Sequence, residues 1–251
     1  MRKIRIGYRL TFLCLVVLAG SVLTVLFLRG SMPPESIQSR VTRWWHRGIA
    51  RGLGMRIHVQ GTPRRHATLY VSNHLSSFDI PALGTILPTR FLSKIELKSW
   101  PLMGWLATRA GTLYIARGGR QAAASTNRLM AQALSEGQNV VLFAEGTVKD
   151  GTVIRFHSRL MQSAVDSCAS VQPVAIRYPI PDDSGKNPAA MVIGSMNFSA
   201  FASRVLAARE MHVELSFGDV VGAENKSRDE LARHAEEEVR RMLDIQISDC
   251  A

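Results

Sequence analysis

Cysteine is scarce in this chain of 251 residues, which contains three: Cys14, Cys168 and Cys250. These are far apart, they match no metal-ligand spacing, and an odd number does not fit a disulfide framework. The sequence therefore predicts no metal site, and a reducing compartment is the simpler expectation. Internal repeats and low-complexity tracts are also lacking. Apolar residues make up 46% of the chain, so a sizeable core is possible.

Acidic residues are nearly lacking from the first quarter of the chain. Residues 1–65 contain twelve lysines and arginines but a single acid, Glu35, whereas residues 66–251 contain nineteen basic and nineteen acidic residues. The whole net charge of +11 therefore lies beside the N-terminus. A nucleic-acid-binding domain would be more evenly basic, so no nucleic-acid partner is expected. A basic segment of this kind is typical of a chain that faces anionic membrane lipid.

Charge is absent from residues 10–28, which read LTFLCLVVLAGSVLTVLFL. As a helix this run would be about 28 Å long, close to the hydrocarbon thickness of about 30 Å. We therefore expect residues 1–30 to form a membrane anchor helix. A cleaved signal peptide is the alternative, but eight apolar or small residues continue beyond Gly20 and favour an anchor. Basic residues flank the run on both sides, so the charge rule does not decide its orientation.

A basic amphipathic helix is predicted within residues 31–56. The segment 35–54, ESIQSRVTRWWHRGIARGLG, mixes apolar side chains with arginines. Trp44 and Trp45 would lie at the depth of lipid head groups if this helix were interfacial. A helix packed on its own domain is equally compatible with the pattern. If both N-terminal helices entered the membrane from one leaflet, the rest of the chain would remain on that side.

Short apolar runs alternate with helical patterns in the remainder of the chain. The predicted strands are 67–72, 112–116, 139–143, 171–176, 189–194 and 211–217. The predicted helices are 77–86, 101–109, 120–136, 158–168, 199–209 and 226–246. This alternation predicts an α/β fold in which helices flank a mainly parallel central sheet.

Polar residues follow three of the predicted strands. His74 and Asp79 lie in VSNHLSSFDIP after the first strand, Arg117 ends the second, and Glu145 follows the third. Ligand sites in α/β folds gather at the carboxyl ends of strands, so we expect these residues to share one site. A histidine oriented by an aspartate suits general-base chemistry near neutral pH. The same pair is also compatible with a purely structural hydrogen bond.

The order and spacing of these residues resemble the glycerolipid acyltransferases, a family typified by 1-acyl-sn-glycerol-3-phosphate acyltransferase. The family's Asn-His-x4-Asp block matches NHLSSFD at 73–79, and its Gly-x3-Ile-x-Arg block matches GTLYIAR at 111–117. Its Phe-Pro-Glu-Gly-Thr block matches FAEGT at 143–147, with Ala144 in place of proline. The resemblance spans residues 40–220.

The resemblance implies a role for each matching residue. His74 would take the proton of the acceptor hydroxyl, and Asp79 would hold its ring in the correct tautomer. The residues implied to bind the substrate are Lys94, Arg117, Glu145, Gly146 and Thr147. Pro173, in the family's fourth and apolar block, would border the acyl pocket.

The implied activity is transfer of an acyl chain from acyl-CoA or acyl carrier protein to the free hydroxyl of a lysolipid, without a cofactor. Residues 57–251 would form the acyltransferase domain. Because acyl thioesters are cytosolic, the active site would face the cytoplasm from the inner membrane. A non-catalytic, membrane-attached lipid-binding module is the alternative class. Such a module would be expected to have lost the histidine–aspartate pair, which is intact here.

The chain departs from the family after EGT, where Val148 occupies the position of an arginine that holds the acceptor phosphate. A subset of the family reads Glu-Gly-Thr-x-x-Asp-Gly and then Phe-x-Ser-x-Leu, which EGTVKDG and FHSRL match here. That subset includes lyso-ornithine-lipid acyltransferases as well as lysophosphatidate enzymes. Because Lys94 and Arg117 remain, the expected acceptor is 1-acyl-sn-glycerol-3-phosphate, giving phosphatidic acid. Lyso-ornithine lipid is the alternative acceptor.

Overall fold

The computed structural model describes residues 2–27, 35–115, 119–145, 155–179 and 204–248. Several sequence predictions fall outside these ranges: the strand at 189–194, the first part of the helix at 199–209, and the predicted site residues Arg117, Gly146 and Thr147.

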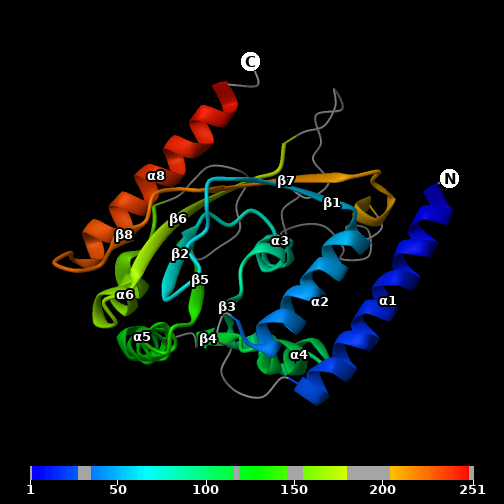
Figure 1. Cartoon of the computed structure of the whole chain (residues 1–251), viewed down its shortest axis with the longest axis horizontal. Helices are drawn as coiled ribbons and strands as arrows, with labels where there is room; N and C mark the ends of the chain where they lie inside the picture. The colour runs from blue at the N-terminus through cyan, green and yellow to red at the C-terminus, as the bar shows by residue number, and fades with distance from the viewer. Residues whose placement is uncertain (1, 28–34, 116–118, 146–154, 180–203, 249–251) are drawn as a thin grey trace.

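A mainly parallel sheet forms the centre of the fold (Figure 1). Its strands follow the order β1-β7-β6-β2-β5-β3-β4, and β8 pairs with β6. The pairs are parallel except those that β6 makes with β7 and β8. The bounds are β1 Met55–Gln60, β2 Thr68–Ser72, β3 Thr89–Lys94, β4 Leu113–Ile115, β5 Asn139–Phe143, β6 Ser170–Arg177, β7 Met211–Phe217 and β8 Val221–Gly222. The predicted α/β class is confirmed.

Helices cover both faces of this sheet. One face packs on α5, α6 and α8 through one apolar cluster, and the other packs on α2 and α3 through a second. Figure 1 shows the two groups on opposite sides of the strands. The helical bounds are α1 Arg2–Phe27, α2 Ile37–Leu53, α3 Asp79–Ile86, η1 Ile95–Ser99, α4 Met103–Arg109, α5 Gly119–Ser135, η2 Ser158–Met161, α6 Gln162–Asp166 and α8 Arg228–Ser248.

Three of the strands, β1, β3 and the two-residue β8, were not expected from the sequence. The segment MRIHVQ of β1 alternates apolar with polar side chains, and TRFLSK of β3 begins and ends with polar residues. The alternation in β1 is itself typical of a half-buried strand, whereas TRFLSK has neither a regular alternation nor a long apolar run. Both become strands because their backbones pair with buried neighbours, β7 and β5 respectively.

Helix α2 begins and ends at well-formed caps. The Ser36 hydroxyl accepts a hydrogen bond from Ser39 N at 3.2 Å. Gly54 ends the helix with φ 73°, a left-handed conformation that favours glycine. The buried face of α2 carries polar and small residues, while Trp44 is 47% exposed. The helix thus packs on its own domain, and contact of its tryptophan face with a membrane stays a prediction.

The helices α1 and α2 lie side by side because small residues separate them (Figure 1). A Cβ atom added to Gly20 would lie 2.4 Å from the Trp45 ring, and one added to Gly48 would lie 2.8 Å from Val16. Such contacts require glycine, and they allow the two backbones to approach closely. Larger residues at Gly20 or Gly48 would therefore force the pair apart.

The first turns of α1 are fixed to the domain by arginines. Arg9 is 5% exposed, and its guanidinium donates to the carbonyl oxygens of Ala208 at 2.8 Å and Arg209 at 2.9 Å. Arg5 donates to Ala207 O at 2.8 Å. Beyond these turns α1 is long and apolar enough to cross a membrane, and it exposes side chains such as Leu18, which is 63% exposed. This feature is consistent with membrane association.

A buried histidine at the α2–α3 contact makes the stability of the fold depend on pH. Burial lowers the pKa of His46 from 6.5 to about 4. Because the unfolded chain binds the proton more readily, stability is complete above pH 6.5 and falls as the pH drops towards 4, by up to about 3 kcal/mol. Thermal unfolding in detergent between pH 7 and 4 measures this. We expect His46→Leu to flatten the pH dependence; an unchanged slope would contradict the assignment.

Candidate active site

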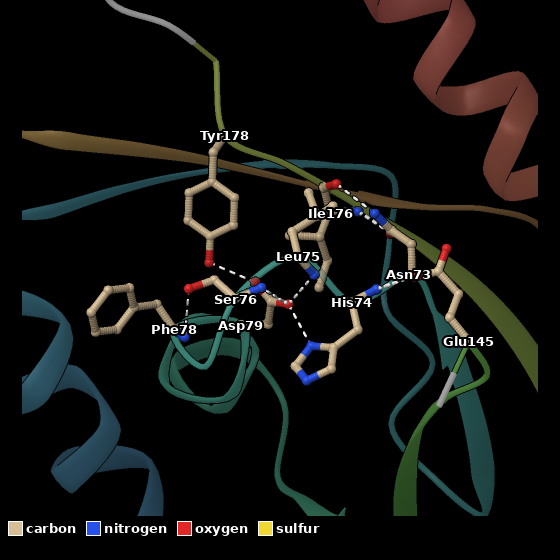
Figure 2. A network of polar contacts seen from close by, with 9 residues as sticks. All are labelled: Asn73, His74, Leu75, Ser76, Phe78, Asp79, Glu145, Ile176 and Tyr178. Atoms are coloured by element: carbon tan, nitrogen blue, oxygen red, sulfur yellow. Dashed lines mark hydrogen bonds and ion pairs between the residues drawn. The ribbon is translucent and has the colours of Figure 1, made fainter. Parts of the chain in front are cut away.

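The carboxyl end of β2 leads into His74, and α3 begins at Asp79 (Figure 2). His74 Nδ1 lies 2.7 Å from Asp79 Oδ2. The Asp79 side chain is fully buried, whereas that of His74 is 18% exposed. Because an ionised carboxylate only accepts hydrogen bonds, Nδ1 carries the proton and Nε2 keeps a free lone pair. Figure 2 shows Nε2 on the side of the ring that faces away from Asp79.

The Asp79 carboxylate is held by donors on both of its oxygens. Oδ2 also accepts from Leu75 N at 2.8 Å and Ser76 N at 3.0 Å. Oδ1 accepts from the Tyr178 hydroxyl at 2.6 Å. A carboxylate removed from water requires such compensation. The carboxylate is therefore fixed in position before any substrate binds, and the ring of His74 is fixed with it.

Tyr178 lies just beyond β6 and is not predicted from the sequence as part of the site. Burial raises its pKa well above the usual value, and the neighbouring Asp79 raises it further. The phenol therefore keeps its proton and remains a donor at neutral pH. No local sequence signal could have found this contact, because the two residues are 99 positions apart.

Strand register brings Glu145 beside the histidine. Ser72 pairs with Phe143 in β5, so His74 and Glu145 each follow a paired residue by two positions. The buried Glu145 accepts a hydrogen bond from His74 N at 3.0 Å. This contact holds the backbone of His74 in place. The role of Glu145 in substrate binding stays a prediction.

Ala144 replaces the family's proline and makes a contact that proline could not make. Its backbone N–H donates to Ser72 O at 3.2 Å, which extends the β2–β5 pairing to the edge of the site.

Asn73 links β2 to its other neighbour, β6. Its side-chain amide donates to Ile176 O at 2.9 Å and accepts from Ile176 N at 2.8 Å. The asparagine of the sequence block therefore fastens β2 to β6.

Phe143, the last residue of β5, stacks on the ring of His74. The centroids of Phe143 and His74 are 4.0 Å apart, with an interplanar angle of 14°. Stacking on one face of the imidazole leaves its Nε2 edge open. The sequence places Phe143 at the end of a predicted strand and at the start of the FAEGT block, but assigns it no role in the site.

Other predicted site residues lie at different distances from this centre. Lys94 is exposed at the end of β3, two strands from β2, which corresponds to about 10 Å across the sheet. Pro173 lies in the middle of β6, where it pairs with Val71, and its side chain is buried within the sheet. The described structure brings Lys94 to the same edge as His74 but does not bring Pro173 there.

The arrangement suits removal of a proton from a neutral hydroxyl. A fixed carboxylate, a ring with one protonated nitrogen and an open Nε2 form a base that can accept a proton and stabilise the resulting imidazolium. The geometry is therefore that of a candidate general base at the carboxyl edge of a parallel sheet.

Comparison with known proteins identifies the family. Residues 56–177 match the family model described as Acyltransferase. The chain is 38% identical over 220 residues to lyso-ornithine lipid O-acyltransferase of Pseudomonas aeruginosa, covering 86% of this chain and 84% of that protein. It is 31% identical over 214 residues to 1-acyl-sn-glycerol-3-phosphate acyltransferase of Neisseria meningitidis, covering 84% and 83%.

A solved structure shares the fold. The crystal structure of the 1-acyl-sn-glycerophosphate acyltransferase PlsC from Thermotoga maritima matches with a TM-score of 0.70 at 20% identity, covering 98% of both chains. At this identity the likeness supports the fold alone. The family model and the sequence relatives show that the chain belongs to the acyltransferase family. The chain is an acyltransferase, as the sequence predicted.

Proposed function

We propose that this enzyme transfers an acyl chain from an acyl thioester to the hydroxyl of lyso-ornithine lipid. The choice of acceptor rests on one observation. The chain is 38% identical, over most of both chains, to a protein that is named for acyl transfer to lyso-ornithine lipid. Val148 supports it, because the arginine used to hold a phosphate is replaced by an uncharged residue. Ornithine carries a carboxylate and an amine, so its head group requires less positive charge than a phosphate monoester.

The histidine–aspartate pair supplies the chemistry of this reaction. The acceptor hydroxyl donates to His74 Nε2, and its proton moves there as the oxygen attacks the thioester carbonyl. The ionised Asp79 stabilises the imidazolium that forms. When the tetrahedral intermediate collapses, the C–S bond breaks and the leaving thiolate takes the proton back from Nε2. The ester and the free thiol are the products.

Lysophosphatidate is the second candidate acceptor, which the sequence alone placed slightly ahead. The relative from Neisseria meningitidis is named for that substrate. Lys94 offers a positive charge at the edge of the sheet that holds His74. The order of the two candidates changes here because the relative named for lyso-ornithine lipid is more similar in sequence.

A direct comparison of acceptors tests the proposal. Purified protein in detergent receives labelled acyl-CoA or acyl carrier protein together with either lysolipid. We expect kcat/KM for lyso-ornithine lipid to exceed that for lysophosphatidate by at least about tenfold. Faster transfer to lysophosphatidate would overturn the proposed acceptor. The same assay compares acyl-CoA with acyl carrier protein as the donor.

A charge introduced at position 148 sharpens this comparison. Val148→Arg restores the arginine of the wider family, and we expect it to raise lysophosphatidate turnover relative to lyso-ornithine lipid. Val220→Arg adds the same charge on the far edge of the domain and serves as the control, since Val220 is exposed there. Equal effects of the two variants would show that position 148 does not choose the acceptor.

The enzyme is proposed to work at the cytoplasmic face of the inner membrane. The arginine contacts that fix the start of α1 to the domain, and the return of α2 alongside α1, support entry of both helices from the side of the domain. Because acyl thioesters are cytosolic, the side that holds the domain and its active site would be the cytoplasmic side. Deleting α1 would expose apolar core as well as remove the anchor, so substitutions on its outer face are the better test.

Two charges on the outer face of α1 are expected to release the enzyme from membranes. Leu18→Arg with Val22→Arg places both on the exposed side, at a cost of about 3 kcal/mol each if they enter the hydrocarbon. We expect most of the protein to move to the soluble fraction after sedimentation, with the transfer activity in detergent retained. Unchanged sedimentation would mean that α2 and other surfaces hold the protein on the membrane.

A further inference from the structure

A groove of about 1050 Å³ lies between α1, α2 and the start of β1. On α2 its wall includes Trp44, Arg47 and Arg51, and on α1 it includes Phe12 and Val16. Neither His74 nor Asp79 lines it. The groove is therefore separate from the catalytic centre.

The lining of the groove is strongly cationic. Six arginines and a single acid line it, and that acid, Glu210, is paired with Arg56 at 2.8 Å. Arg47, Arg51 and Arg209 form no salt bridge with any residue in the described part of the chain. Like charges gathered without carboxylates repel one another, so an anion bound between them would be stabilised.

Arg9 adds a fixed positive charge to the floor of the groove. Its two terminal nitrogens donate to backbone carbonyls, which hold the guanidinium in place without neutralising it. Its Nε is buried and has no hydrogen-bond partner among the described residues. A buried charge with an unsatisfied donor is costly, and a nearby anion would compensate for it.

Apolar side chains line one end of the groove beside Arg47. Along α2, Trp44 lies seven residues before Arg51, and along α1, Val16 lies seven residues after Arg9, which is about 10 Å in each helix. Because the two helices run in opposite directions, their cationic ends coincide and their apolar ends coincide. The apolar end leads towards the exposed leucines and valines of α1.

We propose that this groove binds an anionic phospholipid of the membrane that is not the substrate. Its phosphate lies between Arg47, Arg51 and Arg209, where guanidinium groups can donate paired hydrogen bonds. Its acyl chain follows Phe12, Val16 and Trp44 towards the hydrocarbon. One bound lipid then bridges both N-terminal helices and the catalytic domain, and fixes the orientation of the domain on an anionic membrane.

Native mass spectrometry of the full-length protein in detergent tests this site. Phosphatidylglycerol is the probe, and phosphatidylcholine, with no net charge, is the comparison. We expect the protein to retain one phosphatidylglycerol, and Arg47→Gln with Arg51→Gln to weaken retention at least tenfold. The matched control is Arg40→Gln with Arg43→Gln, which removes the same charge from the same helix outside the groove. This control should bind as the unaltered protein does.

Several results would overturn the proposal. Equal losses in both double variants would mean that only overall charge matters, and equal retention of phosphatidylcholine would mean that the negative charge is not recognised. Displacement of the lipid by millimolar inorganic phosphate would mean a site for the free anion. If the double variant unfolds, Arg209→Gln, outside both helices, should still weaken retention several-fold. Acyl transfer in detergent is measured in parallel, and we expect it to be unchanged, so failure of this site is distinguishable from failure of the proposed function.

Discussion

Replacing His74 with alanine is expected to reduce acyl transfer by about 10²- to 10⁴-fold, because the acceptor hydroxyl loses its base. The side chain lies at the edge of the sheet, and its loss removes one ring contact and one hydrogen bond. We therefore expect a folded protein with a melting temperature close to that of the unaltered enzyme. Initial rates with a labelled acyl thioester and either lysolipid measure the effect.

His66→Ala is the matched control for this experiment. His66 is exposed and precedes β2, at the opposite end of the strand from His74. Its loss should leave the rate within about twofold, as is usual for surface positions away from a site. Near-normal turnover in the His74 variant would exclude the general-base mechanism, and would favour a lipid-binding module or a different catalytic group.

Replacing Asp79 with asparagine is expected to lower kcat by about 10²-fold or more, with a smaller change in KM. The amide keeps the shape of the carboxylate, and its oxygen can still accept from Leu75 N and Ser76 N. What it removes is the negative charge that stabilises the imidazolium in the transition state. A loss confined to kcat therefore separates this role from a purely structural one.

The control for the Asp79 variant is Asp219→Asn, an identical change at an exposed position beyond β7. It should affect neither kcat nor KM. If Asp79→Asn unfolds the protein, the melting temperature will show it. If the variant is folded and fully active, the hydrogen bond to His74 serves only to close the loop between β2 and α3.

Much of the site could be predicted because its parts follow strands. His74 and Asp79 are separated by one short loop, so their side chains can form a hydrogen bond without help from distant parts of the chain. Glu145 follows another strand, and a parallel sheet places the carboxyl ends of neighbouring strands together. Local patterns are sufficient for such contacts, since strand direction and register carry the geometry.

Other contacts had no local signal. Tyr178 reaches Asp79 across 99 positions, and Arg9 reaches carbonyl groups about two hundred positions away. In both cases the partner is supplied by the topology of the chain, which no single window of sequence contains. β1 differs, because MRIHVQ alternates apolar with polar residues, a local pattern that is typical of a half-buried strand.

The sequence by itself determined the α/β class, the apolar first helix, the excess of basic charge at the N-terminus and the pairing of His74 with Asp79. These depend on composition and short spacing, which survive without knowledge of the fold. Only the tertiary structure decided that Glu145 holds the backbone of His74, that Pro173 lies away from the catalytic edge, and that α1 and α2 form a cationic groove. Strand order and helix packing fix such relations, because they bring together side chains that are distant along the chain.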